Sequence, residues 1–236
     1  MPASVLKRLG EEFGIQTAHN WGMTECMFGS SGILSGPHDA LPLDEQVPYK
    51  ATDGRQTPGF QFRLVDDDGR PLPHDGVTKG HLRVRGLWAT RSYLNKEPGS
   101  ATDAAGWLVT GDIATIDPEG YMRIVDRAKD LIKSGGEWIP SSELELACVA
   151  HPEVVQAAAV AVHHPKWQER PLLVVVKKEG SELTSDELRA FLAGKLVKWW
   201  LPDAVVFVDQ METNATGKVL KNRLRETYRH YLEVGE

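Results

Sequence analysis

The sequence predicts an α+β protein in two parts, a β-rich first part and a compact α+β second part. Three observations lead to this fold class. They are an amphipathic segment at residues 1–15, short alternating segments between residues 60 and 125, and a change of pattern after Arg127. The length of 236 residues suits one large or two modest domains.

The first segment places its apolar side chains on one helical face, namely Val5, Leu6, Leu9 and Phe13. Charged residues fill the opposite face. A signal peptide would need a continuous apolar core, so we interpret residues 1–15 as an amphipathic helix.

Strand-like alternation follows. It is found at Phe60–Val65, before the turn cluster DDDGRPLP, and again at Leu82–Gly86. Ala114–Asp117 and Tyr121–Val125 flank Pro118–Gly120, which is the pattern of a hairpin. We therefore expect a small, mostly antiparallel β unit.

Beyond Arg127 the pattern changes to helices and buried strands. Ser142 with Glu145 fits a capping box that opens a helix through about residue 150, and Thr184 with Glu187 fits a second one, opening a helix towards residue 199. The remaining predicted elements are strands at Val154–Val162, Leu172–Val176 and Ala204–Val208, and a final amphipathic helix at Val219–Tyr231.

Composition narrows the function classes. The net charge of −6 gives no electrostatic footprint for nucleic acid or an anionic membrane. Cys26 and Cys148 stand in unrelated contexts, which argues against zinc and against a disulfide framework. No apolar run is long enough to span a bilayer. These features favour a reducing, cytoplasmic location.

The segment Asn20–Glu25, NWGMTE, carries the first candidate site. Glu25 can hold Mg²⁺ through oxygen, Thr24 can bond a phosphate, and Trp21 beside the flexible Gly22 offers a flat wall for a purine or an apolar chain. On this segment alone, a loop with a capping Thr and a buried Trp is the favoured alternative.

WLVTGD, residues 107–112, is the second candidate. A tight turn at Gly111 would aim the Asp112 carboxylate, placed after a strand, at the two hydroxyls of a ribose. An Asp that accepts backbone N–H bonds in a turn is a serious alternative for this segment taken alone.

The third candidate, Asp126–Glu145, is the most informative. Gly135 and Gly136 allow positive φ and close approach of the backbone to a ligand, and Arg127 has a fork that can grip hydroxyls or phosphate. The charged, glycine-punctuated connection also suits an interdomain hinge. The alternative is a polar linker with solvated charges. The apolar aromatic Trp138 close to the glycines argues against it.

The fourth candidate is Thr213–Glu226, in which Gly217 and Lys218 end a turn and open a basic helix. A Lys on a mobile loop can offset developing phosphate or carboxylate charge. The spacing is not that of a Walker A motif. The alternative is an exposed Lys at a helix start.

Together and in this order, the four segments resemble the AMP-forming acyl-CoA synthetases, members of the adenylate-forming superfamily. The resemblance covers nearly the whole chain; it is most specific in Leu108–Glu145 and Ala193–Arg225, and looser in Pro37–Gly80. The sequence motifs GGEWI and KWWLPD are most similar to those of the branch that acts on medium- or long-chain fatty acids. Such enzymes form an acyl-adenylate from ATP and a fatty acid, then transfer the acyl group to coenzyme A.

The resemblance also implies residue roles in the first part. Thr24 would contact the ATP phosphates, and Glu25 would bind Mg²⁺. Trp21 and Gly22 would form the wall shared by adenine and the acyl chain. Asp112 and Arg127 would bind the ribose of ATP or AMP.

In the second part, Lys218 would contact carboxylate and phosphate during adenylation, and Lys129 would be the hinge residue. The loop from Ser134 to Trp138, with Gly135 and Gly136, would line the pantetheine channel of coenzyme A. The small-molecule substrates would be a fatty acid, ATP and coenzyme A.

The resemblance divides the chain into the end of a large AMP-binding domain (1–126, with the β subdomain), a hinge (127–133) and a compact, mobile α+β C-terminal domain (134–236). The family's phosphate loop is absent from the sequence. We therefore expect a piece of a longer enzyme that has little activity alone, exposes Leu6, Leu9 and Phe13, and associates with the missing N-terminal part. The alternative is a non-catalytic nucleotide- or CoA-binding module, or an inactive remnant of such a ligase.

Overall fold

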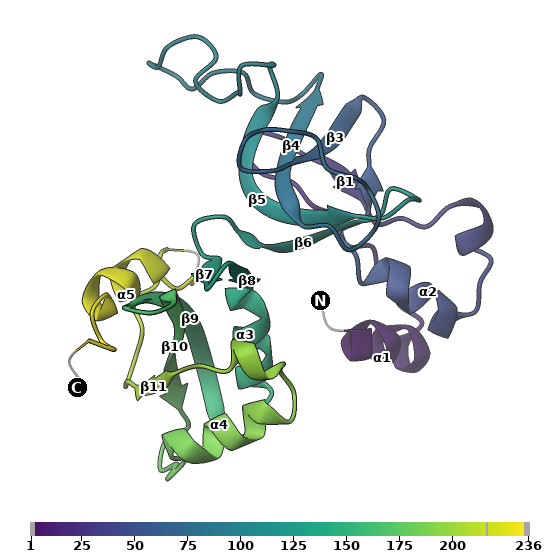
Figure 1. Ribbon diagram of the computed structural model, residues 1–236. Helices are drawn as coiled ribbons and strands as arrows, with labels where there is room; N and C mark the ends of the chain where they lie inside the picture. The colour runs from purple at the N-terminus through teal and green to yellow at the C-terminus, as the bar shows by residue number, and fades with distance from the viewer. Residues whose placement is uncertain (1–2, 216, 234–236) are drawn as a thin grey trace. The chain divides into compact units, whose positions relative to one another are not determined.

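The computed structural model describes residues 3–215 and 217–233, so Met1, Pro2 and Thr216, which fall in the predicted helix 1–15 and the lysine segment, lie outside the described residues. The chain forms two compact units that divide between Ala128 and Lys129 (Figure 1). This division falls inside residues 127–133, the segment that the sequence marks as a hinge. The hinge motion itself stays a prediction.

Unit 1 begins with two packed helices, α1 (Ala3–Phe13) and α2 (Leu43–Lys50). The expectation that the apolar face of α1 lacks partners is wrong for Leu6, which is 2% exposed, while Phe13 is 66% exposed. The helices approach closely at Gly10, where a Cβ atom would lie 2.6 Å from a Leu43 methyl carbon. The partner of Leu6 therefore comes from within this chain.

A four-stranded antiparallel sheet follows, in the order β3-β4-β5-β6 (Figure 1). Successive side chains of a strand point to opposite faces of the sheet. In β3, Phe60, Phe62 and Leu64 are accordingly buried, while Gln61 is exposed. The strands are β3 (Phe60–Val65), β4 (Gly80–Gly86), β5 (Leu108–Ile116) and β6 (Met122–Arg127). Shorter elements precede the sheet, namely β1 (Ser30–Ser31), the 3₁₀ helix η1 (Gly36–His38) and β2 (Arg55–Gln56).

Strand β5 corrects one prediction. Gly111 does not end a strand in a tight turn; it lies within β5 with φ +76°. The β4–β5 register shifts between His81 and Arg83, opposite this glycine, which marks a bulge. Asp112 therefore sits inside the strand, and it is only 3% exposed.

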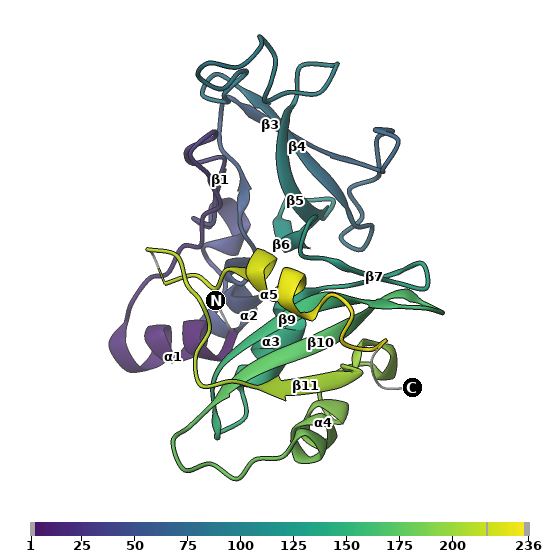
Figure 2. The same cartoon turned by 90° about the vertical axis from the view of Figure 1, so that its left-hand side faces the viewer.

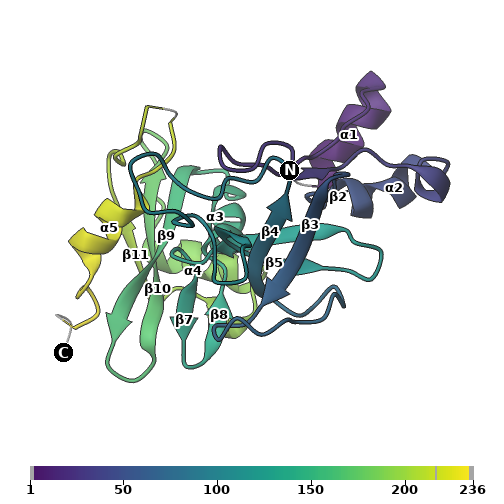
Figure 3. The same ribbon diagram turned by 90° about the horizontal axis from the view of Figure 1, so that it is seen from above.

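Unit 2 is built around β10 (Gln168–Lys177), which pairs with three other strands (Figure 3). It is antiparallel to β9 (Val154–His164) and β7 (Ile132–Ser134), and parallel to β11 (Ala204–Phe207). Strand β8 (Glu137–Ile139) forms a hairpin with β7. The sequence does not predict β7 and β8 as strands.

Helices cover both faces of the β9–β10–β11 part of this sheet (Figure 2). Leu173 and Val175 face the core made with α3 (Ser141–Val149) and α4 (Ser185–Ala193). Leu172 and Val174 face the opposite core, to which α5 (Lys221–Tyr228) contributes. Burial on both faces explains why β9 and β10 are nearly continuous apolar runs.

The helix starts test the two predicted capping boxes. Thr184 and Glu187 form theirs, with both reciprocal hydrogen bonds present. The box predicted at Ser142 is wrong, because α3 begins at Ser141 with Pro140 at the cap position and no side-chain cap bond. Glu145 instead accepts a hydrogen bond from the Ala159 N–H at 2.8 Å.

Two predicted helices are shorter than expected. Helix α4 ends at Ala193, and the 3₁₀ helix η2 (Lys198–Trp200) occupies the end of the predicted span. Helix α5 begins two residues later than expected and ends at Tyr228. Within the described part of the chain, no helix combines the length and apolarity required to cross a bilayer.

Candidate functional site

Three residues of the predicted site meet in unit 1. The Trp21 indole Nε1 donates a hydrogen bond to Asp112 Oδ2 at 3.0 Å, and Arg127 Nε lies 2.8 Å from Asp112 Oδ1. Asp112 is buried, whereas the Arg127 side chain is 50% exposed. The fold thus joins residues from three separate motifs around one carboxylate.

The surroundings of the Asp112 carboxyl have opposing effects on its pKa. Burial raises the pKa of the Asp112 carboxyl, while the Arg127 charge and the indole hydrogen bond lower it. Arg127 Nη1 also donates to the Thr110 carbonyl at 3.5 Å, and because half of the Arg127 side chain is exposed, part of it can still face a ligand. A carboxylate and a guanidinium side by side suit a pair of hydroxyls or a phosphate.

The Trp21 ring is fixed from several directions. It packs edge-on against Phe62 with centroids 5.8 Å apart, and its backbone N–H donates to Ser30 Oγ at 2.9 Å. At Gly29 a Cβ atom would lie 2.5 Å from a ring carbon, so only glycine leaves room for the indole. The indole N–H is therefore held in place to bond Asp112.

Thr24 and Glu25 occupy a tight turn. Met23 and Cys26 close it with two backbone hydrogen bonds of 3.1 and 2.9 Å. Glu25 Oε1 accepts a hydrogen bond from the Tyr93 hydroxyl at 3.0 Å, and this bond raises the pKa of Tyr93. Tyr93 lies 68 residues beyond Glu25 in the chain and is not predicted as a site residue from the sequence.

Glu25 is the metal ligand that the sequence predicts. In the part of the chain that the structure describes, no group of three or more His, Cys, Asp or Glu side chains is arranged to hold a metal ion. Mg²⁺ commonly takes one or two protein carboxylates and completes its shell with water and substrate phosphates. A single carboxylate beside an exposed Thr24 fits that mode of binding.

A hollow of about 450 Å³ opens beside this turn. Met27 and Phe28, which are not among the residues predicted from the sequence, are 64% and 67% exposed there. The two residues lie in an irregular loop, where the sequence has no helical or strand periodicity. Their exposure therefore could not be predicted from the sequence pattern. The lining residues are Asn20, Trp21, Gly22, Met23, Thr24, Met27 and Phe28.

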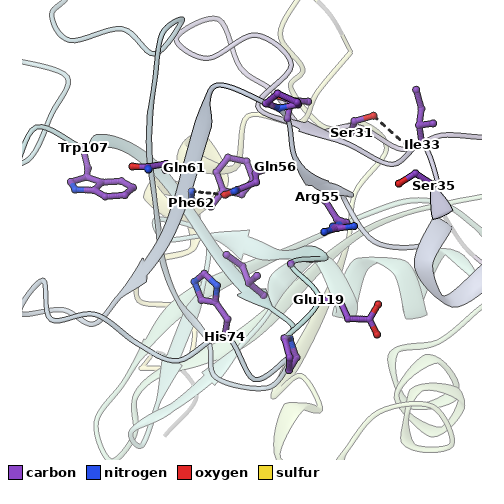
Figure 4. Close-up of a pocket in the computed structure, with 15 residues that line it drawn as sticks. Ser31, Ile33, Ser35, Arg55, Gln56, Gln61, Phe62, His74, Trp107 and Glu119 are labelled. Atoms are coloured by element: carbon purple, nitrogen blue, oxygen red, sulfur yellow. Dashed lines mark hydrogen bonds between the residues drawn. The ribbon is translucent and has the colours of Figure 1, made fainter. Parts of the chain in front are cut away.

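A larger hollow of about 840 Å³ lies elsewhere in unit 1; Trp107 of the second candidate segment lines it, but none of the residues given a binding role does (Figure 4). Gln61, Phe62 and Trp107 line one part of it, and Arg55 and Glu119 another. Gln56 Oε1 accepts a hydrogen bond from the Phe62 N–H at 3.1 Å, which covers an outward-facing amide of the edge strand β3. This hollow is separate from the Trp21–Asp112–Arg127 cluster in its lining residues.

The predicted coenzyme A loop forms the tip of the β7–β8 hairpin in unit 2. Gly135 and Gly136 both have positive φ, +58° and +88°. A Cβ atom at Gly135 would lie 3.0 Å from Trp167, whereas Gly136 has nothing within 4 Å. Ser134 is fully buried, and its Oγ accepts a hydrogen bond from Arg170 Nη1 at 3.1 Å.

Lys218 is exposed on a turn that Asn214 closes. Asn214 Oδ1 accepts from the Lys218 N–H at 2.9 Å, and the Asn214 N–H donates to the Lys218 carbonyl at 2.8 Å. Gly217 has φ +80°, a conformation that favours glycine. Lys129 is exposed and is the first residue of unit 2. The roles predicted for both lysines stay predictions.

Two family profiles match the chain. The profile of the AMP-binding enzymes matches residues 1–94, and that of the AMP-binding enzyme C-terminal domain matches residues 143–218. A 3-methylmercaptopropionyl-CoA ligase of Ruegeria lacuscaerulensis is 50% identical over 98% of this chain. A medium-chain-fatty-acid–CoA ligase of Ectopseudomonas oleovorans is 47% identical over 96%. The chain spans 43% and 42% of these two relatives, less than half of their length.

Solved structures agree with the sequence relatives. ATP-bound MatB from Rhodopseudomonas palustris is 30% identical, with a TM-score of 0.79 over 97% of this chain and 44% of that one. The o-succinylbenzoate CoA synthetase of Bacillus subtilis, in complex with its acyl-adenylate intermediate, is 28% identical, with a TM-score of 0.80 over 95% and 44%. On its two matched domains, its ligase relatives and its fold, this chain belongs to the AMP-binding, adenylate-forming family of acyl-CoA synthetases.

Proposed function

We propose that this chain contributes the adenylate-binding and coenzyme A-binding residues of an AMP-forming ligase that activates a medium- or long-chain fatty acid. The observation that carries this proposal is the Trp21–Asp112–Arg127 cluster, on the same unit as the Thr24–Glu25 turn. It gives one face of unit 1 the donors and acceptors that a ribose and its phosphate require.

In this proposal Asp112 and Arg127 hold the ribose of ATP and then of the acyl-adenylate. A carboxylate accepts from two hydroxyls, and the neighbouring guanidinium donates to a hydroxyl or phosphate oxygen. Thr24 bonds the phosphate, and Glu25 supplies one oxygen ligand to Mg²⁺, which offsets charge on the phosphates when bound. Tyr93 holds the Glu25 carboxylate in one orientation.

Fatty-acid specificity rests on the hollow beside Trp21. Its exposed Met27 and Phe28 offer apolar surface to an alkyl chain, and methionine adapts readily to irregular shapes. The medium-chain ligase relative supports an alkyl substrate, while the 3-methylmercaptopropionyl-CoA ligase relative supports a short thioether acid. Competition between octanoate and 3-methylmercaptopropionate decides between the two.

Unit 2 is assigned the residues that change between half-reactions. Lys218 offsets charge on the carboxylate and phosphate during adenylation. The Ser134–Trp138 loop borders the path of the pantetheine arm, where Gly136 leaves open space. Lys129, next to the boundary between the units, is the pivot.

Binding of AMP to the chain, measured by calorimetry, tests the proposal most directly. Asp112→Asn should weaken AMP binding by about 10-fold or more, because a buried hydrogen-bonded carboxylate loses its charge. The exposed Asp68→Asn is the matched control and should bind like the native chain. Equal affinity in all three proteins would remove the ribose assignment.

Activity separates a ligase from a module that only binds. ATP–pyrophosphate exchange with octanoate and Mg²⁺ should be weak or undetectable in this chain alone. It should be recovered when the chain replaces the matching C-terminal part of the Ectopseudomonas oleovorans ligase. AMP and coenzyme A binding without exchange in that chimera would favour the non-catalytic module instead.

A further inference from the structure

Arg170 is a buried cation near the start of β10, with only 6% of its surface exposed. Its Nε and Nη2 both donate to Asp203 Oδ1, at 2.9 and 2.7 Å. Its Nη1 donates to Ser134 Oγ at 3.1 Å and to the Trp199 carbonyl at 2.9 Å, and its Nη2 donates to the Leu201 carbonyl at 3.0 Å. One guanidinium therefore ties β10 to two other segments of unit 2, the end of β7 at Ser134 and residues 199–203.

The first of these segments is the predicted coenzyme A loop. Ser134 is 0% exposed and its hydroxyl accepts from Arg170, so its side chain faces the interior and not a ligand. Ser134 pairs with Gln168 in the sheet, so the bond from Arg170 helps to hold the start of the loop beside β10. A planar fork with five donors is the side chain suited to that task.

The second of these segments, residues 199–203, contributes Trp199 to a pair of indoles next to the loop. The Arg170 guanidinium lies over the Trp199 ring at 4.8 Å, and Trp199 packs edge-on against Trp167 at 4.9 Å. Gly135 sits against both rings, and its N–H donates to the Trp167 carbonyl at 3.0 Å. A shift of Trp199 would therefore be transmitted directly to Gly135.

From these contacts we infer that Arg170 is a positioning residue that fixes the Gly135–Gly136 backbone in the form that accepts the pantetheine arm. It acts through Ser134 and Trp199 and does not touch the substrate. Asp203 compensates its buried charge and orients the fork. This inference rests on the proposed role of the loop in coenzyme A binding.

Hydrogen exchange on the intact chain tests the structural half of the inference. Arg170→Met keeps much of the side-chain length but removes all five hydrogen bonds. The Gly135 amide should then exchange at least about 10-fold faster, because the network that holds its acceptor is lost. Arg189→Met, at an exposed position of α4, is the matched control and should leave that amide unchanged.

Coenzyme A binding to the same proteins tests the functional half. Arg170→Met should weaken coenzyme A binding by about 10- to 100-fold, the scale expected when a positioned group shifts by about 1 Å. AMP binding to unit 1 should stay within about 2-fold of the native value. Arg170→Lys keeps the charge opposite Asp203 but cannot reach all the acceptors, so it should restore thermal stability more than coenzyme A affinity.

Each outcome decides the matter. Faster Gly135 exchange with weaker coenzyme A binding in Arg170→Met, and incomplete rescue by lysine, support the inference. Native exchange at Gly135, full rescue by lysine, or an equal loss of AMP and coenzyme A affinity overturns it. If the native chain binds no coenzyme A, the proposed function of the loop fails, while the exchange experiment still decides whether Arg170 positions it.

Discussion

Trp21 and Asp112 are 91 residues apart in the chain, yet the indole Nε1 of one donates to the carboxylate Oδ2 of the other at 3.0 Å. This bond connects the loop that carries Glu25 to the strand that carries Asp112. It also explains why a tryptophan stands here, since a phenylalanine offers the same apolar face without a donor.

Trp21→Phe should therefore destabilise unit 1 by about 1–3 kcal/mol, because a mostly buried carboxylate loses a charge-assisted hydrogen bond. The pKa of Asp112, already raised by burial, should rise further. Urea unfolding monitored by circular dichroism measures the first effect. Trp88→Phe is the control, since Trp88 is 64% exposed and its loss should change stability by less than about 0.5 kcal/mol. Equal effects of the two substitutions would contradict the role given to the bond.

Gln168 occupies a conformation that glycine adopts more easily, with φ +69° at the turn between β9 and β10. A non-glycine residue in this region carries a steric cost of about 1–2 kcal/mol, partly offset by the greater chain entropy that glycine loses on folding. Gln168→Gly should thus stabilise unit 2 by about 0.5–1 kcal/mol. Differential scanning calorimetry should show a higher Tm.

The matched control is Gln156→Gly in the interior of β9, which should destabilise the same unit by about 0.5–1 kcal/mol. A fall in stability at both positions would show that the Gln168 side chain contributes more than its backbone costs.

How far the sequence predicted this fold depends on how local each signal is. β3 was predicted with its observed bounds because apolar and polar residues alternate over its first five positions. The Thr184 capping box was predicted because both partners lie within one turn. The Ser142 box has the same spacing but fails, since tertiary partners engage Glu145, among them the Ala159 N–H.

The same distinction between local and long-range signals applies to the candidate site. Trp21, Asp112 and Arg127 were proposed as candidates from their motifs, yet nothing local indicated that Trp21 and Arg127 would both contact the Asp112 carboxylate. Tyr93 was missed because its bond to Glu25 spans 68 residues and lies in no motif. Strands β7 and β8 were missed because three residues each are too few to show a period.

Both cysteines are buried, and burial raises the pKa of the Cys26 thiol to about 11 and of the Cys148 thiol to about 12. At pH 8 on the order of one Cys26 side chain in a thousand is then a thiolate, so the folded chain should react very slowly with a disulfide reagent such as DTNB. In urea both thiols should react rapidly. Stoichiometric labelling of the folded chain at the rate of a free thiol would contradict this expectation.

The same shifts fix the sign of a pH effect on stability. The unfolded thiols ionise near the ordinary cysteine pKa of 9.0, whereas the folded thiols stay protonated. The free energy of unfolding should consequently fall as the pH rises above about 9, over a window that ends at about 11 for Cys26 and about 12 for Cys148. The double variant Cys26→Ala, Cys148→Ala should lose that part of the pH dependence, and an unchanged slope would show that other groups cause it.

The final prediction concerns the division of labour between Lys218 and Gly136 in the chimera with the Ectopseudomonas oleovorans ligase. Both residues belong to unit 2, and the proposed function gives them different half-reactions. Lys218→Ala should slow adenylation by about 10²–10³-fold, because a charge that stabilises the transition state is lost. It should spare thioester formation from a supplied acyl-adenylate. The exposed Lys178→Ala is the control for loss of a surface charge.

Gly136→Leu should have the opposite effect, slowing thioester formation while adenylation continues. Gly136 has φ +88°, so any side chain there is strained, and a leucine would also fill the open space beside the loop. Gly180→Leu separates the two causes, since Gly180 has φ +75° and nothing within 4 Å but lies in a remote turn. Lys129→Pro, which fixes φ at the predicted hinge, should leave at most one half-reaction active. Both half-reactions are assayed separately in every variant; if Lys218→Ala and Gly136→Leu slow them to the same degree, the two residues support one static site and the two-pose assignment is wrong.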